Sequence, residues 1–282
     1  MTAPVTAATR VLALLGDPVS HSLSPVFQNA AIRALGLDGV YVALRCSAED
    51  LPGLLRALAR AGGGGNVTVP HKGAAAAAVE RRTDAVEATG ACNSFWMEDG
   101  EIWGGNTDVE GVTAAIRSLM GRSIAGARVL LLGAGGAARA AAYALATHAA
   151  GEIVILNRTP ERAREMQGRF ARPETRIRVA ATPRELGTDG FDLAIHATSL
   201  GLRADDPLPL DPGTAPQIDA ALDLVYTRTG ETPWVRAMRE RGVPTADGTE
   251  MLLQQGAAAF RRWWGVDPPL KAMREALAGA QG

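Results

Sequence analysis

One stretch decides the fold: Val129-Leu130-Leu131-Leu132-Gly133-Ala134-Gly135-Gly136-Ala137-Ala138. Its apolar start predicts a buried strand, its glycines a tight turn, and its alanines the first turn of a helix. In this pattern Gly133 permits the turn, and Gly135 lets a pyrophosphate approach the backbone. The helix then offers free N–H groups and a positive dipole end to the phosphates. The stretch therefore predicts a dinucleotide site made by Gly133, Ala134, Gly135, Gly136 and Ala137.

The segment after the next predicted strand indicates which dinucleotide is bound. Methyltransferases and flavoproteins carry a similar turn, and an NAD site usually has an acidic residue at the end of this second strand. Here the strand ends in Leu156-Asn157-Arg158-Thr159, with Arg162 one helical turn later. No carboxylate stands there, whereas two guanidinium groups suit the 2′-phosphate of NADP. We therefore expect NADP, with its 2′-phosphate bound by Arg158 and Arg162, and with Asn157 and Thr159 beside them in the cofactor site.

Strands and helices alternate along the whole chain, which predicts an α/β fold. The first half reads as an open α/β sheet, with strands at 10–15, 40–44 and 66–69 and helices at 24–36, 50–61 and 73–82. The glycine run at 62–65 is expected to form a loop. The second half reads as a doubly wound parallel sheet, with strands at 128–132, 152–156, 192–196 and 221–225 and helices at 111–120, 137–147, 161–170 and 233–241. Two closing helices are expected at 254–264 and 269–278, and domain changes near residues 110 and 249.

Composition excludes several classes of protein. The chain has 282 residues, 47% hydrophobic and 21% charged, with a net charge of −1. Such a charge gives no electrostatic footprint for nucleic acid or for an anionic membrane, and no apolar run is long enough to span a bilayer. The start of the sequence lacks the pattern of a secretory signal, so a cytoplasmic enzyme is expected. Cys46 and Cys92 are too few for a metal cluster or a disulfide framework and are expected to be buried filler.

Polar residues follow several of the predicted strands. Ser22 and Ser24 stand before a helix, where two hydroxyls and a helix N-terminus suit a carboxylate, although Ser24 would also serve as an ordinary N-cap. Lys72 follows a strand that ends in proline, and it faces either a crevice above the sheet or solvent. Asp108 reads as a functional carboxylate or as a helix N-cap, and Asn93 as a ligand group or as a turn residue. These alternatives stay open on the residues alone.

Taken together, these segments resemble the shikimate dehydrogenase family, which includes quinate and aminoshikimate dehydrogenases. The resemblance covers nearly the whole chain, and its order and spacing are those of the family. The matching segments are Gly16-Asp17-Pro18-Val19-Ser20-His21-Ser22-Leu23-Ser24-Pro25, Asn66-Val67-Thr68-Val69-Pro70-His71-Lys72, Gly90-Ala91-Cys92-Asn93-Ser94, Asn106-Thr107-Asp108, Gly133-Ala134-Gly135-Gly136-Ala137, Asn157-Arg158-Thr159, Ala197-Thr198-Ser199-Leu200-Gly201, Asp223-Leu224-Val225-Tyr226 and Gly248-Thr249-Glu250-Met251-Leu252-Leu253-Gln254-Gln255.

The resemblance implies reduction of 3-dehydroshikimate to shikimate by NADPH, a step of chorismate and aromatic amino-acid biosynthesis. It implies two domains: an open α/β substrate domain at 1–110, completed by the C-terminal helices at 249–282, and a Rossmann-like, doubly wound NADP domain at 111–248. A small-molecule substrate is then the expected partner, with no nucleic acid or membrane. Whether the chain forms a homodimer stays open, as does a preference for quinate or aminoshikimate over shikimate.

The resemblance also implies roles for individual residues. Lys72 and Asp108 would be the catalytic pair, with Lys72 exchanging the proton of the ring hydroxyl and Asp108 orienting it. Both would also contact the substrate. The substrate carboxylate would be held by Ser22, Ser24 and Tyr226, and the ring hydroxyls by Thr68, Asn93 and Gln255. The nicotinamide side would be lined by Asp84, Leu224 and Gly248. His196 departs from the family pattern, which often has Asn there, and it is expected to be structural.

Overall fold

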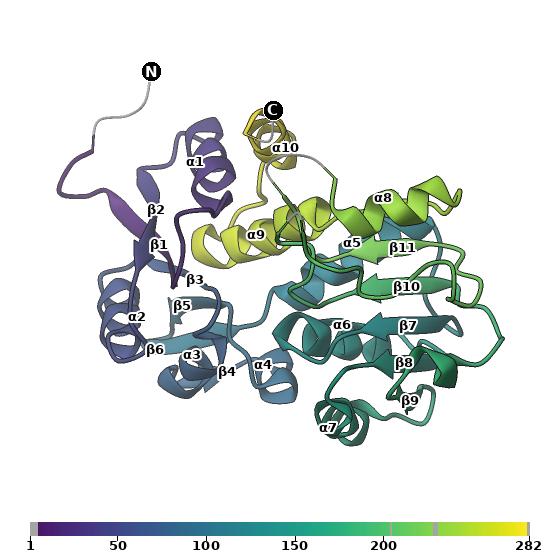
Figure 1. Cartoon of the computed structure of the whole chain (residues 1–282). Coiled ribbons are helices and arrows are strands. Elements are labelled where there is room, and N and C mark those ends of the chain that lie inside the picture. Colours follow the sequence, from purple (N-terminus) through teal and green to yellow (C-terminus); the bar gives the residue numbers. More distant parts are fainter. Residues whose placement is uncertain (1–4, 204, 228–230, 281–282) are drawn as a thin grey trace. The chain divides into compact units, whose positions relative to one another are not determined.

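The computed structural model of the chain describes residues 5–203, 205–227 and 231–280. It divides into two compact units (Figure 1). Unit 1 consists of Met1–Thr107 and Leu252–Gly282, and unit 2 of Asp108–Met251. The sequence predicted domain boundaries after residue 110 and before residue 249. In the structure the first boundary comes three residues earlier, after Thr107, and the second three residues later, before Leu252.

Unit 1 is built on a mixed sheet with the strand order β2-β1-β3-β5-β6-β4. Strand β5 runs antiparallel to both of its neighbours, and the other pairings are parallel. One apolar core packs β1 and β3 against α2 and α3, with Leu15, Leu55 and Phe95 fully buried. The elements of this part are β1 (Arg10–Gly16), α1 (Ser24–Ala34), β2 (Gly39–Arg45), α2 (Leu51–Arg60), β3 (Gly64–Val67), α3 (Lys72–Ala78), β4 (Arg81–Arg82), α4 (Asp84–Thr89), β5 (Ser94–Glu98), β6 (Glu101–Gly105), α9 (Thr249–Trp264) and α10 (Leu270–Gly279).

The glycine run does not form the expected loop throughout, because Gly64 and Gly65 belong to strand β3. A Cβ atom on Gly64 would lie 2.7 Å from the Phe95 carbonyl oxygen, and one on Gly65 would lie 2.1 Å from the Ala13 carbonyl oxygen. Only glycine permits so close an approach of neighbouring strands and of the Phe95 ring. Gly64 and Gly65 therefore allow close packing inside the sheet, and strand β3 begins two residues earlier than predicted.

The structure also shows a hairpin that the sequence analysis missed. Strands β5 and β6 pair antiparallel, with Glu98 opposite Glu101. Asp99 and Gly100 between them both have positive φ, at 50° and 78°. This is the two-residue Asp-Gly connection that favours a tight hairpin. The helix predicted at 73–82 accordingly stops at Ala78, and the chain goes on into the short edge strand β4.

Unit 2 is a parallel sheet with the strand order β12-β11-β10-β7-β8-β9. If β7 is counted as strand 1 and the sheet is read from β9 to β12, this order is 3-2-1-4-5-6. That is the order of a doubly wound dinucleotide-binding fold, so the predicted fold class is confirmed. Strands β7 and β8 have the predicted bounds, whereas β9 was not predicted. The elements are α5 (Asp108–Met120), β7 (Arg128–Leu132), α6 (Gly136–Thr147), β8 (Glu152–Leu156), α7 (Pro160–Phe170), β9 (Arg176–Ala180), the 3₁₀ turn Pro183–Leu186, β10 (Leu193–His196), β11 (Ala221–Asp223), α8 (Pro233–Glu240) and β12 (Thr245–Ala246).

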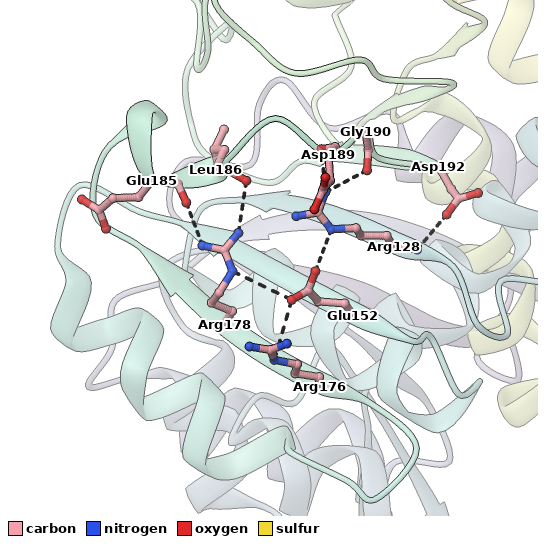
Figure 2. A network of polar contacts seen from close by, with 9 residues as sticks. All are labelled: Arg128, Glu152, Arg176, Arg178, Glu185, Leu186, Asp189, Gly190 and Asp192. Atoms are coloured by element: carbon pink, nitrogen blue, oxygen red, sulfur yellow. Dashed lines mark hydrogen bonds and ion pairs between the residues drawn. The ribbon is translucent and has the colours of Figure 1, made fainter.

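A polar network ties the amino ends of β7, β8 and β9 together (Figure 2). Glu152 accepts from the Arg128 Nε at 2.6 Å, and its other oxygen lies 3.8 Å from the Nε atoms of Arg176 and Arg178. The Arg128 guanidinium also lies over the Phe191 ring, 4.3 Å from its centroid. The first residues of adjacent strands are therefore cross-linked at the edge of the sheet opposite the Gly133 turn.

Among the residues that the structure describes, no helix is both long and apolar enough to cross a membrane. The same residues include no group of three or more His, Cys, Asp or Glu side chains placed to hold a metal ion.

Candidate active site

The topology of unit 1 brings several predicted site residues to one edge of its sheet. Strands β1 and β3 are parallel, so the segments after both of them emerge at the same edge. Since Asn66 pairs with Ser94, and Ser94 with Gly105, the start of β5 and the end of β6 lie at that edge too. The residues that follow or precede these strand ends are Ser22, Ser24, Thr68, Lys72, Asn93 and Thr107.

Asn93 is the centre of a buried polar cluster at this edge. Its Oδ1 accepts from the Thr107 backbone N–H at 2.7 Å and from the Thr107 hydroxyl at 3.2 Å. Its Nδ2 lies 3.4 Å from the Oε1 of Gln255, which is on α9. Only 2% of Asn93 and 8% of Gln255 is exposed. Asn93 is thus more than a turn residue, since its amide holds two separate segments of unit 1 together beside Lys72.

Two further buried hydrogen bonds hold this cluster in place. The Asn66 Nδ2 donates to the Asn93 carbonyl at 3.0 Å, and its Oδ1 accepts from the Tyr41 hydroxyl at 2.8 Å. Burial raises the pKa of the Tyr41 phenol, so the hydroxyl stays protonated as the donor. Asn66, Tyr41 and Thr107 were not singled out from the sequence. The available signal was a buried-looking strand, Gly64-Gly65-Asn66-Val67, that carries an amide in its middle.

Helix α9 carries Gln255 to the cluster because it packs closely on α1. A Cβ atom on Gly256 would lie 2.4 Å from the Phe27 ring, and the Gln28 Nε2 donates to the Gly256 carbonyl at 2.9 Å. The glycine therefore permits the contact that positions its neighbour.

Ser22, and not Ser24, makes the local hydrogen bond at the start of helix α1. Helix α1 begins at Ser24, and its N-cap residue is Leu23, whose side chain makes no capping hydrogen bond. The prediction of Ser24 as the N-cap is therefore wrong. Instead, the Ser22 Oγ accepts from the Ser24 backbone N–H at 3.1 Å and so satisfies a donor at the helix start. Ser24 is buried and Ser22 half-buried.

Lys72 is the first residue of α3 and is half-buried. Its carbonyl accepts from the Cys92 backbone N–H at 2.9 Å, which holds the helix start beside the loop that carries Asn93. A positive charge at the amino end of a helix opposes the helix dipole, typically by about 0.3–1 kcal/mol. Stability of α3 therefore does not explain this lysine. Thr68, which is half-buried, donates its backbone N–H to the Leu15 carbonyl at 2.8 Å.

Asp108 is the first residue of α5 and belongs to unit 2. Only 5% of it is exposed, and a carboxylate at the amino end of a helix is stabilised by the dipole. A helix-start role is thus compatible with its position. Lys72 lies in unit 1, so the two members of the predicted catalytic pair belong to different units.

The glycine turn of unit 2 joins β7 to α6 and has an open backbone. Gly133 has φ +116°, and a Cβ atom there would lie 2.8 Å from the Ala197 carbonyl oxygen. Cβ atoms on Gly135 and Gly136 would meet nothing within 4 Å, so a ligand can approach that backbone. Helix α6 begins at Gly136 without a side-chain cap, which leaves its first N–H groups to a ligand. Ala134 and Ala138 are buried beneath the turn, and Ala137 half-buried.

Arg158 and Arg162 lie beside this turn. The Gly133 N–H donates to the Leu156 carbonyl at 2.9 Å, so the end of β8 adjoins the glycines. Both arginines are exposed, and neither has an ion-pair or hydrogen-bond partner within the described parts of the chain. The Asn157 Nδ2 donates to the Thr159 carbonyl at 2.7 Å and so shapes the loop before α7. Two unneutralised guanidinium groups at this place suit an additional phosphate.

The remaining predicted cofactor positions lie in two places. Leu224 follows β11, and its N–H donates to the His196 carbonyl at 2.9 Å. A Cβ atom on Gly248 would lie 2.5 Å from the Leu224 carbonyl oxygen, so these two segments are in close contact. Tyr226 is half-buried two residues after Leu224. Asp84 is exposed at the start of α4 and belongs to unit 1, whereas Leu224, Tyr226 and Gly248 belong to unit 2.

Three histidines, His71, His148 and His196, have backbone or buried partners. The His71 Nε2 lies 2.9 Å from the Cys46 carbonyl oxygen, and the His148 Nδ1 lies 2.8 Å from the Ala144 carbonyl oxygen. His196 is fully buried between other side chains.

Family models match three parts of the chain. "Shikimate dehydrogenase substrate binding domain" matches residues 14–95, "Shikimate / quinate 5-dehydrogenase" residues 115–200, and "Shikimate 5'-dehydrogenase C-terminal domain" residues 248–278. A curated relative from Rubrobacter xylanophilus, named Shikimate dehydrogenase (NADP(+)), is 43% identical over 279 residues, covering 96% of each chain.

Solved structures agree with these matches. A shikimate 5-dehydrogenase from Thermus thermophilus, in complex with NADP(H) and shikimate, superposes with a TM-score of 0.84 at 36% identity. That comparison covers 96% of this chain and 99% of the other. A 5-ketofructose reductase from Gluconobacter gives a TM-score of 0.86 at 26% identity, covering 97% and 99%. With relatives of such identity over nearly its whole length, the chain belongs to the shikimate dehydrogenase family.

Proposed function

We propose that this chain is an NADP-dependent shikimate dehydrogenase, which reduces 3-dehydroshikimate to shikimate reversibly in chorismate and aromatic amino-acid biosynthesis. The observation that carries the proposal is the edge of the unit 1 sheet, where Lys72 lies beside the buried Asn93–Thr107–Gln255 cluster. A lysine among fixed amides and hydroxyls suits a small polyol whose hydroxyl must gain or lose a proton. The NADP(+)-dependent relatives support the same activity.

The substrate is proposed to bind unit 1 chiefly through hydrogen bonds. Ser22 and Ser24, with Tyr226 of unit 2, hold the carboxylate. Thr68, Asn93 and Gln255 bind the ring hydroxyls. Their amides and hydroxyls supply both donors and acceptors, which a polyol requires. A site built of such buried polar groups rejects analogues that leave one of them unpaired.

Lys72 and Asp108 are the proposed catalytic pair. The bound cofactor supplies the hydride that reaches the carbonyl carbon. Lys72 gives a proton from its ammonium group to the carbonyl oxygen and takes it back in the reverse reaction, while Asp108 orients Lys72 and contacts the substrate. Positioned acid–base groups of this kind typically contribute about 10²–10⁴-fold to the rate.

NADP is proposed to bind unit 2. Gly133, Ala134, Gly135, Gly136 and Ala137 form the pyrophosphate turn, which the open backbone at Gly135 and Gly136 supports. Asn157, Arg158, Thr159 and Arg162 form the site of the 2′-phosphate. Asp84, Leu224 and Gly248 line the nicotinamide. In this assignment 1–110 with 249–282 is the substrate domain, and 111–248 is the NADP domain.

The proposal extends to the location and the assembly of the chain. A cytoplasmic location agrees with a reductive NADPH enzyme and with the two cysteines, both of which are buried as free thiols. An assembly of two copies is the state to test first, by sedimentation of the purified chain.

A second candidate is a quinate or aminoshikimate dehydrogenase of the same family. The match to a model described as shikimate / quinate 5-dehydrogenase supports this candidate, as does the likeness to a 5-ketofructose reductase, whose name gives another substrate. Comparison of kcat/KM decides between the candidates, because specificity is a ratio of these values.

The experiment is steady-state reduction of NADP⁺, followed by the absorbance of NADPH, with shikimate, quinate and aminoshikimate as substrates. Each is repeated with NAD⁺. We expect the highest kcat/KM with shikimate and NADP⁺. A higher value with quinate or aminoshikimate would replace the proposed substrate, and a higher value with NAD⁺ would replace the proposed cofactor.

A further inference from the structure

His196 is a fully buried side chain at the end of β10, and both of its ring nitrogens have partners. The Nδ1 lies 2.9 Å from the Asp223 Oδ1, and the Nε2 lies 2.6 Å from the Thr198 Oγ1. The ring also packs edge-on against Trp234, with centroids 5.5 Å apart and planes at 64°. The imidazole therefore has one defined place in the core.

The hydrogen bonds around Asp223 define which nitrogen of His196 donates. Asp223 is fully buried, and its oxygens also accept from the Val225 N–H at 2.9 Å and from the Thr232 hydroxyl at 2.6 Å. A carboxylate only accepts, so the His196 Nδ1 carries the hydrogen of that bond. In a neutral ring the Nε2 is then an acceptor and takes the Thr198 hydroxyl hydrogen. A continuous series of hydrogen bonds results: Thr198 donates to His196, and His196 donates to Asp223.

This series of hydrogen bonds contacts the segments at the carboxyl ends of the strands of the unit 2 sheet. A Cβ atom on Gly133 would lie 3.0 Å from the Thr198 Cγ2, so Thr198 packs on the first glycine of the turn. The Thr198 Oγ1 also accepts from the Leu200 N–H at 3.1 Å and so shapes the loop after β10. At the other end, Asp223 holds the turn after β11, where Leu224 contacts Gly248.

We propose that His196 is a positioning residue for the dinucleotide site, acting through its bond to Thr198. The inference rests on the proposed function of unit 2 and goes beyond it. His196 is 0% exposed, so any effect on a bound dinucleotide passes through its neighbours. Its ring holds the Thr198 hydroxyl so that the threonine methyl supports Gly133 from below, which keeps the turn in the shape that receives the pyrophosphate.

A double-mutant cycle tests the bond between the two residues. His196→Asn retains a group at the Nδ1 position for Asp223 but does not reach Thr198, and Thr198→Val keeps the methyl contacts while losing the hydroxyl. Each change should raise the Kd of NADP⁺ about 3- to 10-fold, the typical value of one hydrogen bond. The double variant should be no weaker than either single variant, because both remove the same bond. His196→Gln, whose amide reaches the Nε2 position, should restore part of the affinity.

Thr232→Val is the matched control, because it removes a hydroxyl from the other side of the same carboxylate. Thr232 caps α8 by accepting from the Val235 N–H at 3.3 Å. This variant should unfold at a lower temperature and still bind NADP⁺ within about twofold of the wild type. A purely structural role of His196 would instead make Kd independent of the Thr198 bond in all the variants.

Titration calorimetry of NADP⁺ without substrate separates this inference from the proposed function. Additive losses in the double variant, or an unchanged Kd in both single variants, would overturn the inference while NADP⁺ binding by the wild type upholds the cofactor. If the wild type binds NAD⁺ in place of NADP⁺, the proposed cofactor is wrong, and the same cycle read with NAD⁺ decides the inference. A wild-type chain that binds neither overturns both.

Discussion

Lys72 is one of only two lysines in a chain with 29 lysine and arginine side chains. Wherever a surface or an ion pair needs a positive charge, this sequence nearly always uses arginine. A guanidinium group does not release its proton in proteins, whereas an ammonium group can. The chemical difference between the two side chains thus gives a reason for a lysine at the sheet edge of unit 1. The amide cluster beside it gives the proposed substrate its fixed partners.

Arg158 tests the choice of cofactor at a single residue. Arg158→Ala should raise the KM of NADP⁺ about 10- to 100-fold, because charge-assisted hydrogen bonds to a phosphate are worth roughly 1.5–3 kcal/mol. The kcat/KM with NAD⁺ should change little, since NAD⁺ lacks the 2′-phosphate. Arg164→Ala, at an exposed arginine that pairs with Glu161 on the same helix, serves as the control. Equal losses with both cofactors would argue against a 2′-phosphate contact.

Cys92 gives a prediction for alkaline pH. Burial raises its pKa from 9.0 to about 12. Above pH 9 the thiol of the unfolded chain loses its proton while the folded one keeps it, so the folded state is destabilised as the pH rises. The free energy of unfolding should fall by about 1.4 kcal/mol per pH unit between pH 9 and 12 from this group.

Urea unfolding of the wild type and of Cys92→Ala across this range isolates the contribution of the thiol. The variant should show a constant offset below pH 9, since neither chain titrates there at this position. Above pH 9 the wild type should approach the variant. Curves that stay parallel up to pH 12 would show that the thiol ionises equally in both states.

At the scale of elements, the glycine–alanine stretch at 129–138 was sufficient to predict β7, the turn and α6. Two neighbouring signals of the same strength were missed. Asp99-Gly100 is a hairpin signal, because it lies between two short segments with apolar residues, 95–97 and 102–103. The alternation in Arg176-Ile177-Arg178-Val179 is typical of a half-exposed strand. The glycines at 64 and 65 are different, because their place inside β3 depends on Phe95 and Ala13. Those contacts are tertiary, and local sequence does not contain them.

Glu152 tests how the strands of unit 2 are held at their amino ends. Glu152→Gln should lower the free energy of unfolding by about 1–3 kcal/mol, because Arg128, Arg176 and Arg178 lose their shared carboxylate in a partly buried place. Glu161→Gln breaks an exposed pair on α7 and should change it by less than about 1 kcal/mol. Chemical denaturation measures both. A loss no greater for Glu152→Gln than for Glu161→Gln would mean that the network in Figure 2 is dispensable.

At the scale of the whole molecule, the fold class and the family were both predicted from the sequence. Polar residues that follow strands were predictable as candidates, since the edge of a sheet is where such residues gather. Their supports were not, because Tyr41, Asn66 and Thr107 reach Asn93 only through the antiparallel pairing of β5. The local role of Ser22 depends in the same way on where α1 begins.

The central claim is that this chain oxidises shikimate with NADP⁺ through Lys72, and its two lysines provide a matched comparison. Lys271 is exposed on α10, paired at 3.9 Å with Glu275. NADP⁺ reduction by shikimate should be measured for the wild type, Lys72→Met and Lys271→Met. We expect kcat to fall about 10²–10⁴-fold for Lys72→Met, with an unchanged Kd for NADP⁺, and to stay near wild type for Lys271→Met. Turnover by Lys72→Met equal to that of Lys271→Met would contradict the account.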